Sequence, residues 1–178
     1  VEVDVGSLGW RTMSNVYHRG GALEWGQYFR PEDWAAGLRQ GCRELCREHP
    51  DIQVNAVSAA GARQSCVLLD GNDRAFLGLP NIDNRGRAYM AQVPEHDEIY
   101  RLSGKWATED FGAAKLLGLR MQHPEQYEAV ERVLSLSAWI AWLFTGRKVM
   151  EYTPACESTL SHLGQRRRSP TPCRLYGM

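Results

Sequence analysis

Two kinds of periodicity divide the chain into an early part with strand patterns and a later part with helix patterns. Valine alternates with carboxylates over residues 1–5, and apolar and polar residues alternate over residues 52–60. Both patterns are typical of half-exposed strands. Residues 66–69 form a short apolar run followed by an Asp-Gly-Asn turn. They predict a further strand, with residues 75–82 as its hairpin partner.

Helical spacing appears once between these strands and then dominates the rest of the chain. Residues 31–49 carry an apolar stripe and begin with a proline, which suits the first turn of a helix. Later helices are expected at residues 95–102, 111–121, 124–132 and 138–144, the last capped by Ser137 and stopped by Gly146. Strands with one early helix, followed by helices, predict an α/β domain with a mixed sheet.

The composition is that of an ordinary globular domain, with 43% hydrophobic and 24% charged residues. Basic and acidic residues number 21 each, so net charge gives no argument for a nucleic-acid or anionic membrane partner. The apolar run at residues 133–144 is shorter than the ~20 residues that span a bilayer, and we expect it in the core. The first nine residues lack the apolar run of a signal peptide.

Cysteine usage predicts a reduced, cytoplasmic protein. There are five cysteines, an odd number, and none are spaced as CxxC. Cys42 and Cys46 lie four apart on a predicted helix and could begin a metal site. No further His or Cys completes a ligand set, so buried thiols are favoured.

The last fourteen residues, 165–178, differ from the rest. They hold three consecutive arginines, two prolines and no apolar periodicity. We therefore expect one domain over residues 1–164 and a disordered or non-native tail over residues 165–178.

Four stretches follow one another in a distinctive order: Asp4-Val-Gly-Ser-Leu-Gly-Trp-Arg11, residues 57–70, Pro80-Asn-Ile-Asp-Asn-Arg85, and residues 99–159. Together they resemble the N-terminal domain of the FGGY carbohydrate kinases, and within that family they are most similar to autoinducer-2 and xylulose kinases. The resemblance covers residues 1–163. It implies an RNase H-like domain of the type shared by actin, hexokinase and Hsp70 ATPases.

The chain departs from the family pattern in two respects. The segment between the glycine-rich loop and Glu24-Trp25 is short, so we expect part of the second and third strands to be missing. Family kinases are also more than twice as long, and their second domain binds adenine and supplies the aspartate that acts as base.

The resemblance implies that residues 4–11 hold the phosphates of ATP. Asp4 would hold Mg²⁺ through water, and Gly6 and Gly9 would let the backbone turn towards anionic oxygens. Ser7 could donate its hydroxyl and Arg11 could pair with a phosphate. Without the resemblance, the same residues fit a plain strand–turn–strand equally well.

Five polar residues are implied as contacts of the phosphoryl acceptor: Arg63, Gln64, Asp83, Asn84 and Asp110. Planar donors and acceptors of this kind recognise hydroxyl groups, and loops at sheet ends can reach a ligand. The alternative for the first four is a pair of polar turns in solvent. Asp110 fits equally well as the N-cap of the helix that begins at Phe111.

The implied reaction is transfer of the γ-phosphoryl group of ATP to a hydroxyl of a small sugar, ketose, polyol or related hydroxyketone, with the base absent from this chain. We expect the chain alone to be inactive and to self-associate through the face that a second domain would cover. One alternative is a truncated or degenerate fragment without enzymatic function. Another is an actin-like nucleotide-binding module, which the polar acceptor residues argue against.

Overall fold

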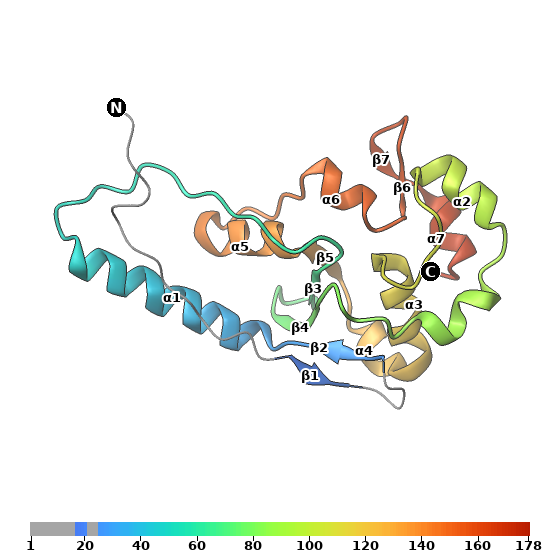
Figure 1. The fold of residues 1–178 in the computed structure, drawn as a ribbon, viewed down its shortest axis with the longest axis horizontal. Coiled ribbons are helices and arrows are strands. Elements are labelled where there is room, and N and C mark those ends of the chain that lie inside the picture. Colours follow the sequence, from blue (N-terminus) through green and yellow to red (C-terminus); the bar gives the residue numbers. More distant parts are fainter. Residues whose placement is uncertain (1–16, 21–24) are drawn as a thin grey trace.

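A three-stranded antiparallel sheet with helices on both faces forms the body of the molecule (Figure 1). The computed structural model describes residues 17–20 and 25–178. In chain order the elements are β1 (His18–Arg19), β2 (Gln27–Tyr28), α1 (Pro31–Glu48), β3 (Cys66–Leu69), β4 (Ala75–Leu79), the 3₁₀ helix η2 (Arg87–Gln92), α2 (His96–Ser103), α3 (Gly112–Gln122), α4 (Pro124–Glu128), β5 (Arg132–Ser135), α5 (Leu136–Thr145), α6 (Tyr152–Cys156), β6 (Ser161–His162), β7 (Arg167–Arg168) and α7 (Pro170–Leu175).

Strand β3 lies at the centre of the sheet, in the order β4-β3-β5. Its first residue, Cys66, pairs with Leu79 of β4 on one side and Ser135 of β5 on the other. All four of its residues are buried. A short apolar run without alternation is the pattern of a strand covered on both faces.

Successive side chains of β3 point to opposite faces of the sheet, so the strand contributes to two separate cores. Cys66 and Leu68 face a core that includes residues of α2, α3 and the segment around α7. Val67 and Leu69 face a second core with Ala35 of α1 and residues of α5. The sheet is therefore the middle layer between two sets of helices (Figure 1).

Most of the predicted elements are confirmed. Helix α1 begins at Pro31 as expected, and α2 ends at Gly104, whose φ of 73° is the left-handed conformation that favours glycine. The predicted hairpin is β3–β4, and the helix expected at residues 111–121 is α3. Trp139, expected in the core, is 2% exposed.

The chain between α3 and α5 was predicted wrongly in two details. The helix expected over residues 124–132 ends at Glu128, and residues 132–135 form β5 because they pair with β3. The helix that follows is capped by the Ser135 hydroxyl, which accepts the N–H of Ala138 at 3.2 Å, and not by Ser137. The apolar run at residues 133–144 thus contains a strand and a helix.

The strand expected over residues 52–60 is absent. These residues have no regular structure, and Val54 and Val57 are 59% and 54% exposed. An isolated strand is not stable without a neighbour, and no strand in the described ranges pairs with this segment. The strand predicted at residues 1–5 lies outside the described residues.

Residues 165–178 are ordered, contrary to the prediction of a disordered tail. Strand β7 pairs with β6, and Pro170 begins α7. Tyr176 is 1% exposed in the first core, where its hydroxyl lies 3.3 Å from that of Thr159. The apolar residues of the tail are too few to show periodicity, but they are enough to cover one edge of this core.

Two glycines offer a matched test of the packing between α3 and the loop that follows β4. An alanine Cβ at Gly118 would lie 2.5 Å from the backbone carbon of Arg85, whereas at Gly71 it would meet nothing within 4 Å. We expect Gly118→Ala to destabilise the fold by about 1–3 kcal/mol, despite the better helix propensity of alanine. Gly71→Ala should change stability by less than about 0.5 kcal/mol. Urea unfolding followed by circular dichroism measures both, and a Gly118→Ala variant as stable as the parent would contradict the close packing.

Candidate functional site

Two of the residues predicted to contact the phosphoryl acceptor are hydrogen-bonded to each other near the N-terminal end of α3. Gln64 Nε2 donates a hydrogen bond of 2.9 Å to Asp110 Oδ2, across 46 positions of sequence. Thr108 Oγ1 donates to the other carboxylate oxygen of Asp110. The backbone of Gln64 has a φ of 61°, a conformation that is strained for a residue with a side chain. The loop thus holds Gln64 in an uncommon conformation that places its amide against Asp110.

Asp110 is not a helix cap. The N-cap of α3 is Phe111, and no side chain caps this helix end. Both oxygens of the Asp110 carboxylate instead accept hydrogen bonds from Gln64 and Thr108. The N-cap alternative is therefore wrong.

Asp83 points into the protein. Its side chain is fully buried, and Arg85 Nε donates to its two oxygens at 3.0 and 2.9 Å. The N–H of Gln27 donates to Oδ1 at 2.8 Å. Burial raises the pKa of Asp83, while the charge of Arg85 and the bond from Gln27 oppose this shift. In this arrangement the carboxylate holds together the loop at residues 80–86 and the strand β2.

Asn84 and Arg63 are placed differently from Asp83. Asn84 is half-buried; its N–H donates to the carbonyl of Trp25 at 2.9 Å, and its side-chain Oδ1 is buried without a partner in the part of the chain that the structure describes. Arg63 is exposed and lines a cavity together with Gln64.

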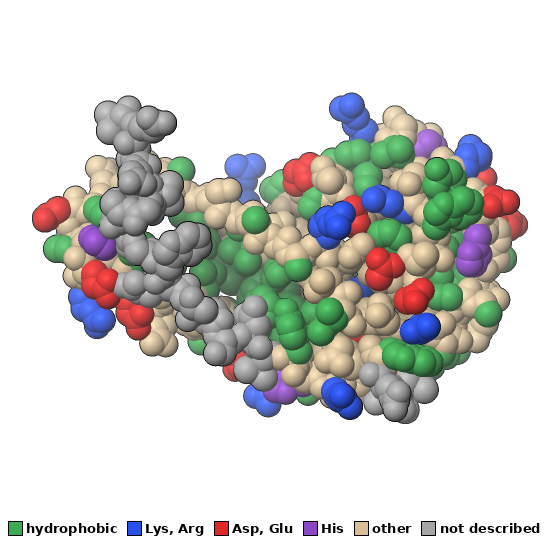
Figure 2. Space-filling view, in the orientation of Figure 1, with side chains coloured by type: hydrophobic (Ala, Val, Ile, Leu, Met, Phe, Trp, Pro, Cys, Tyr) green, Lys and Arg blue, Asp and Glu red, His purple; other side chains and the backbone are tan. Residues whose placement is uncertain are grey.

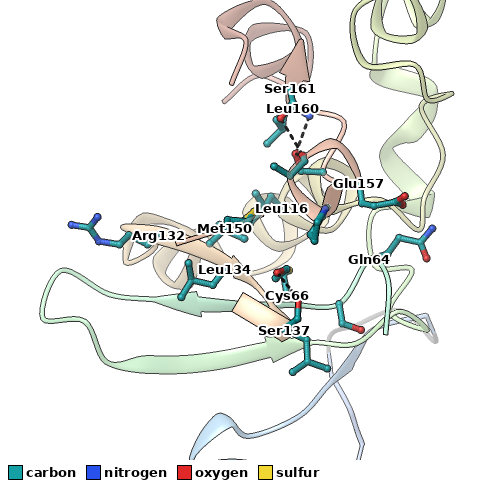
Figure 3. Close-up of a pocket in the computed structure, with 18 of the residues that line it drawn as sticks. Gln64, Cys66, Leu116, Arg132, Leu134, Ser137, Met150, Glu157, Leu160 and Ser161 are labelled. Carbon is teal, nitrogen blue, oxygen red and sulfur yellow. Dashed lines mark hydrogen bonds between the residues drawn. The ribbon is translucent and has the colours of Figure 1, made fainter. Parts of the chain in front are cut away.

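That cavity has a volume of about 830 Å³ and lies between the sheet and the segment that carries α6. Figure 3 shows Gln64 and Glu157 towards one side of it and Arg132 on the opposite side, with Leu116 and Met150 between them. Glu157 is held by Lys105, whose Nζ lies 3.1 Å from Oε1. A cavity lined by apolar side chains together with a few polar groups is typical of small-molecule sites.

Lys115 is a residue of this region that the sequence patterns did not assign to the site. It is fully buried on α3, and its Nζ donates to the carbonyl oxygens of Pro80 and, at 3.3 Å, Asn81. Burial lowers the pKa of Lys115. A lysine on the apolar face of a predicted helix was the signal that could have identified it, because lysine is rarely buried in full.

The residues predicted to bind phosphate belong to the first part of the chain. Asp4, Gly6, Ser7, Gly9 and Arg11 all lie outside the described residues, so their roles remain those implied by the resemblance. Within residues 17–20 and 25–178, no group of three or more His, Cys, Asp or Glu side chains could hold a metal ion. Over the same ranges, no helix is long and apolar enough to cross a membrane.

The family of the chain follows from comparison with known sequences. Residues 22–178 match the FGGY family of carbohydrate kinases, N-terminal domain. This match includes residues 165–178, which the sequence patterns had set apart. The chain belongs to this family.

Individual relatives agree with this assignment. The sugar kinase YoaC of Bacillus subtilis is 36% identical over 152 residues, covering 85% of this chain and 31% of YoaC. An autoinducer-2 kinase of Salmonella choleraesuis is 27% identical over 135 residues, covering 72% of this chain and 25% of the kinase. The chain thus spans about a third or less of the length of these relatives.

Solved structures confirm the fold class. The crystal structure of a xylulose kinase from Brucella ovis superimposes with a TM-score of 0.81 at 18% identity, covering 92% of this chain and 34% of that one. The fold is therefore the α/β actin- and hexokinase-like ATPase fold of the FGGY kinases.

The cysteine thiols of the chain should differ in reactivity. Of the two cysteines on α1, Cys46 is exposed, whereas Cys66 on β3 is buried and burial raises its pKa from 9.0 to about 11. We expect iodoacetamide at pH 9 to modify Cys46 quickly and Cys66 only after unfolding, because the thiolate is the reactive form. Peptide mass spectrometry with time would measure both rates, and equal rates in the native chain would contradict the buried position of Cys66.

The same shift has a consequence for stability. Between pH 9 and about 11 the unfolded chain loses the Cys66 proton while the folded chain keeps it. The unfolded state then binds fewer protons, so the contribution of this thiol to stability is present below pH 9 and is lost as pH rises towards 11. A Cys66→Ala variant should show a shallower fall in unfolding free energy over this range.

Proposed function

We propose that this chain forms the acceptor-binding part of an ATP-dependent carbohydrate kinase, which transfers the γ-phosphoryl group of ATP to a hydroxyl of a sugar, ketose, polyol or related hydroxyketone. The observation that carries the proposal is the bond between Gln64 and Asp110, since it unites two residues implied as acceptor contacts. The family match and the names of the relatives support the same reaction class.

The chemistry of the paired side chains suits a hydroxyl ligand. A hydroxyl both donates and accepts, so it needs an acceptor and a donor in fixed positions. Asp110 supplies carboxylate oxygens, and Gln64 keeps its carbonyl oxygen and a second N–H free of the bond between them. Arg63, exposed at the cavity, adds a charged donor.

The second loop contributes through Asn84 in this proposal. Its buried Oδ1 has no partner among the described residues, and a small rotation could offer it to a ligand hydroxyl. Asp83 would act on the loop itself, because its carboxylate is already bound by Arg85 and Gln27. This assigns Asp83 a different role from the direct contact implied by the resemblance.

The phosphate side of the proposal rests on the resemblance. Asp4, Gly6, Ser7, Gly9 and Arg11 would hold ATP and Mg²⁺, and the ion would supply neutralisation of the phosphate charge. The general base would come from a second part of the kinase, and a cytoplasmic setting fits the free cysteines.

Self-association forms part of the same proposal. Apolar side chains such as Phe144 on α5 and Val149 after it are 42% and 61% exposed. Figure 2 shows hydrophobic side chains gathered in the hollow between α1 and the body of the molecule. Surfaces of this kind promote association unless another part of a protein covers them.

The 178-residue chain by itself should show no sugar kinase activity, because the proposed base and half of the cleft are not on it. A coupled ADP-release assay with Mg-ATP and a panel of pentoses, hexoses, polyols and hydroxyketones measures this. A full-length FGGY kinase in the same assay serves as the positive control. Turnover well above background by the purified chain would show that the expectation is wrong.

Acceptor binding should depend on the Gln64–Asp110 pair. We expect Asp110→Ala and Gln64→Ala each to weaken binding of D-xylulose about tenfold or more, because each removes hydrogen bonds that involve a charged or fixed partner. Ligand-detected NMR titration can measure the dissociation constant, because it suits the weak binding expected of a chain that carries one side of the cleft. Asp51→Ala, at an exposed turn after α1, removes the same chemical group as a matched control. If both site variants bound D-xylulose as tightly as the parent does, the loops that carry Gln64 and Asp110 would be ordinary polar turns.

A further inference from the structure

Among the residues that the structure describes, Lys115 is buried without an ion-pair partner. Its side chain has no exposed area, and in the described part of the chain no carboxylate lies within ion-pair distance of it. Both of its hydrogen bonds go to backbone carbonyls, those of Pro80 and Asn81. Burying a lysine in this way is costly, and an apolar residue of similar shape would pack on the same helix face at less cost.

The carbonyls that Lys115 holds belong to the loop that carries Asn84. The carbonyl of Pro80 also accepts the N–H of Asp83 at 3.0 Å, so one oxygen joins the lysine to the turn of the loop. Two turns further along α3, Gln122 Nε2 donates to the carbonyl of Arg85 at 3.0 Å. Helix α3 therefore fixes both ends of the loop at residues 80–86.

Lys115 also relates this loop to the other acceptor loop. Helix α3 begins at Gly112, two residues after Asp110, which holds Gln64. The charges that favour the protonated form of Lys115 against its burial are those of Cys66, Asp83 and Asp110, while Arg85 opposes it. The ammonium thus lies within the electrostatic influence of both loops, from one position on a rigid helix.

We propose that Lys115 is a positioning residue, which sets the loop carrying Asn84 at a fixed place relative to the Gln64–Asp110 pair. Its role towards a ligand rests on the proposed function, whereas its hold on the loop does not. Lys115 touches no acceptor itself. It acts through the carbonyls of Pro80 and Asn81.

The first test needs no ligand. Lys115→Met removes the donors, Lys115→Gln keeps a neutral donor, and Leu119→Ala, on the same helix and equally buried, controls for general destabilisation. We expect amide hydrogen exchange at Asp83 and Asn84, corrected for global stability, to be at least tenfold faster in Lys115→Met, with a smaller effect in Lys115→Gln. Exchange equal to that of Leu119→Ala would overturn the positioning role.

The second test observes Lys115 in the parent chain, so its main readout does not depend on whether a Lys115 variant folds. The chain has only three lysines, Lys105, Lys115 and Lys148. Lysine labelled with ¹⁵N and ¹³C at its ε end gives three side-chain signals, and Lys105→Arg and Lys148→Arg assign them. We expect the Lys115 signal to shift when D-xylulose binds, and Lys115→Gln to weaken that binding.

The outcomes separate the two proposals. Binding of D-xylulose without a shift at Lys115, together with unchanged affinity in Lys115→Gln, would overturn the positioning role and leave the proposed function standing. If neither D-xylulose nor glycerol bound the parent chain, the proposed function would fail. The hydrogen-exchange comparison would then decide the hold of Lys115 on the loop by itself.

Discussion

The packing of the loop at residues 80–86 against α3 is the constraint on which the rest of the structure depends. Arg85 and Asp83 form a buried ion pair, and Arg85 also donates to the carbonyl of Gln27 at 2.9 Å. These bonds join β2, which precedes α1, to the loop at residues 80–86, and α3 holds the same loop through Lys115 and Gln122. Removing either partner would leave an unpaired buried charge, which is far more destabilising than the intact pair is stabilising.

Two polar side chains from distant loops meet next to the start of α3. The loop before β3 brings Gln64, and the turn before α3 brings Asp110. Strand β3 is fixed by a core on each face, so the position of Gln64 is determined by buried packing. Polar side chains on loops between rigid elements can be held to a ligand-binding geometry without being buried themselves.

The sequence predicted those features that depend on local pattern. Proline at the start of α1, glycine after α2 and the apolar run of β3 each act within a few residues. Strand β5 was missed because Arg132–Ser135 becomes a strand only by pairing with β3, more than sixty positions earlier. The order of the tail was missed for the same reason, since Tyr176 is buried against distant residues. Likewise, no local pattern tells whether Asp83 faces a ligand or Arg85.

The orientation of the Gln64 amide shows how such a site could discriminate between ligands. The carboxylate of Asp110 only accepts hydrogen bonds, so its partner on Gln64 is the amide nitrogen, and the carbonyl oxygen points elsewhere. A ligand that meets Gln64 from the cavity therefore finds an oriented acceptor in a fixed place. The hydroxyl from Thr108 satisfies the second oxygen of Asp110 and keeps the carboxylate from turning. If the proposed site is correct, these two bonds would hold Gln64 and Asp110 in place, so that a ligand with a matching hydroxyl would bind without first ordering these side chains.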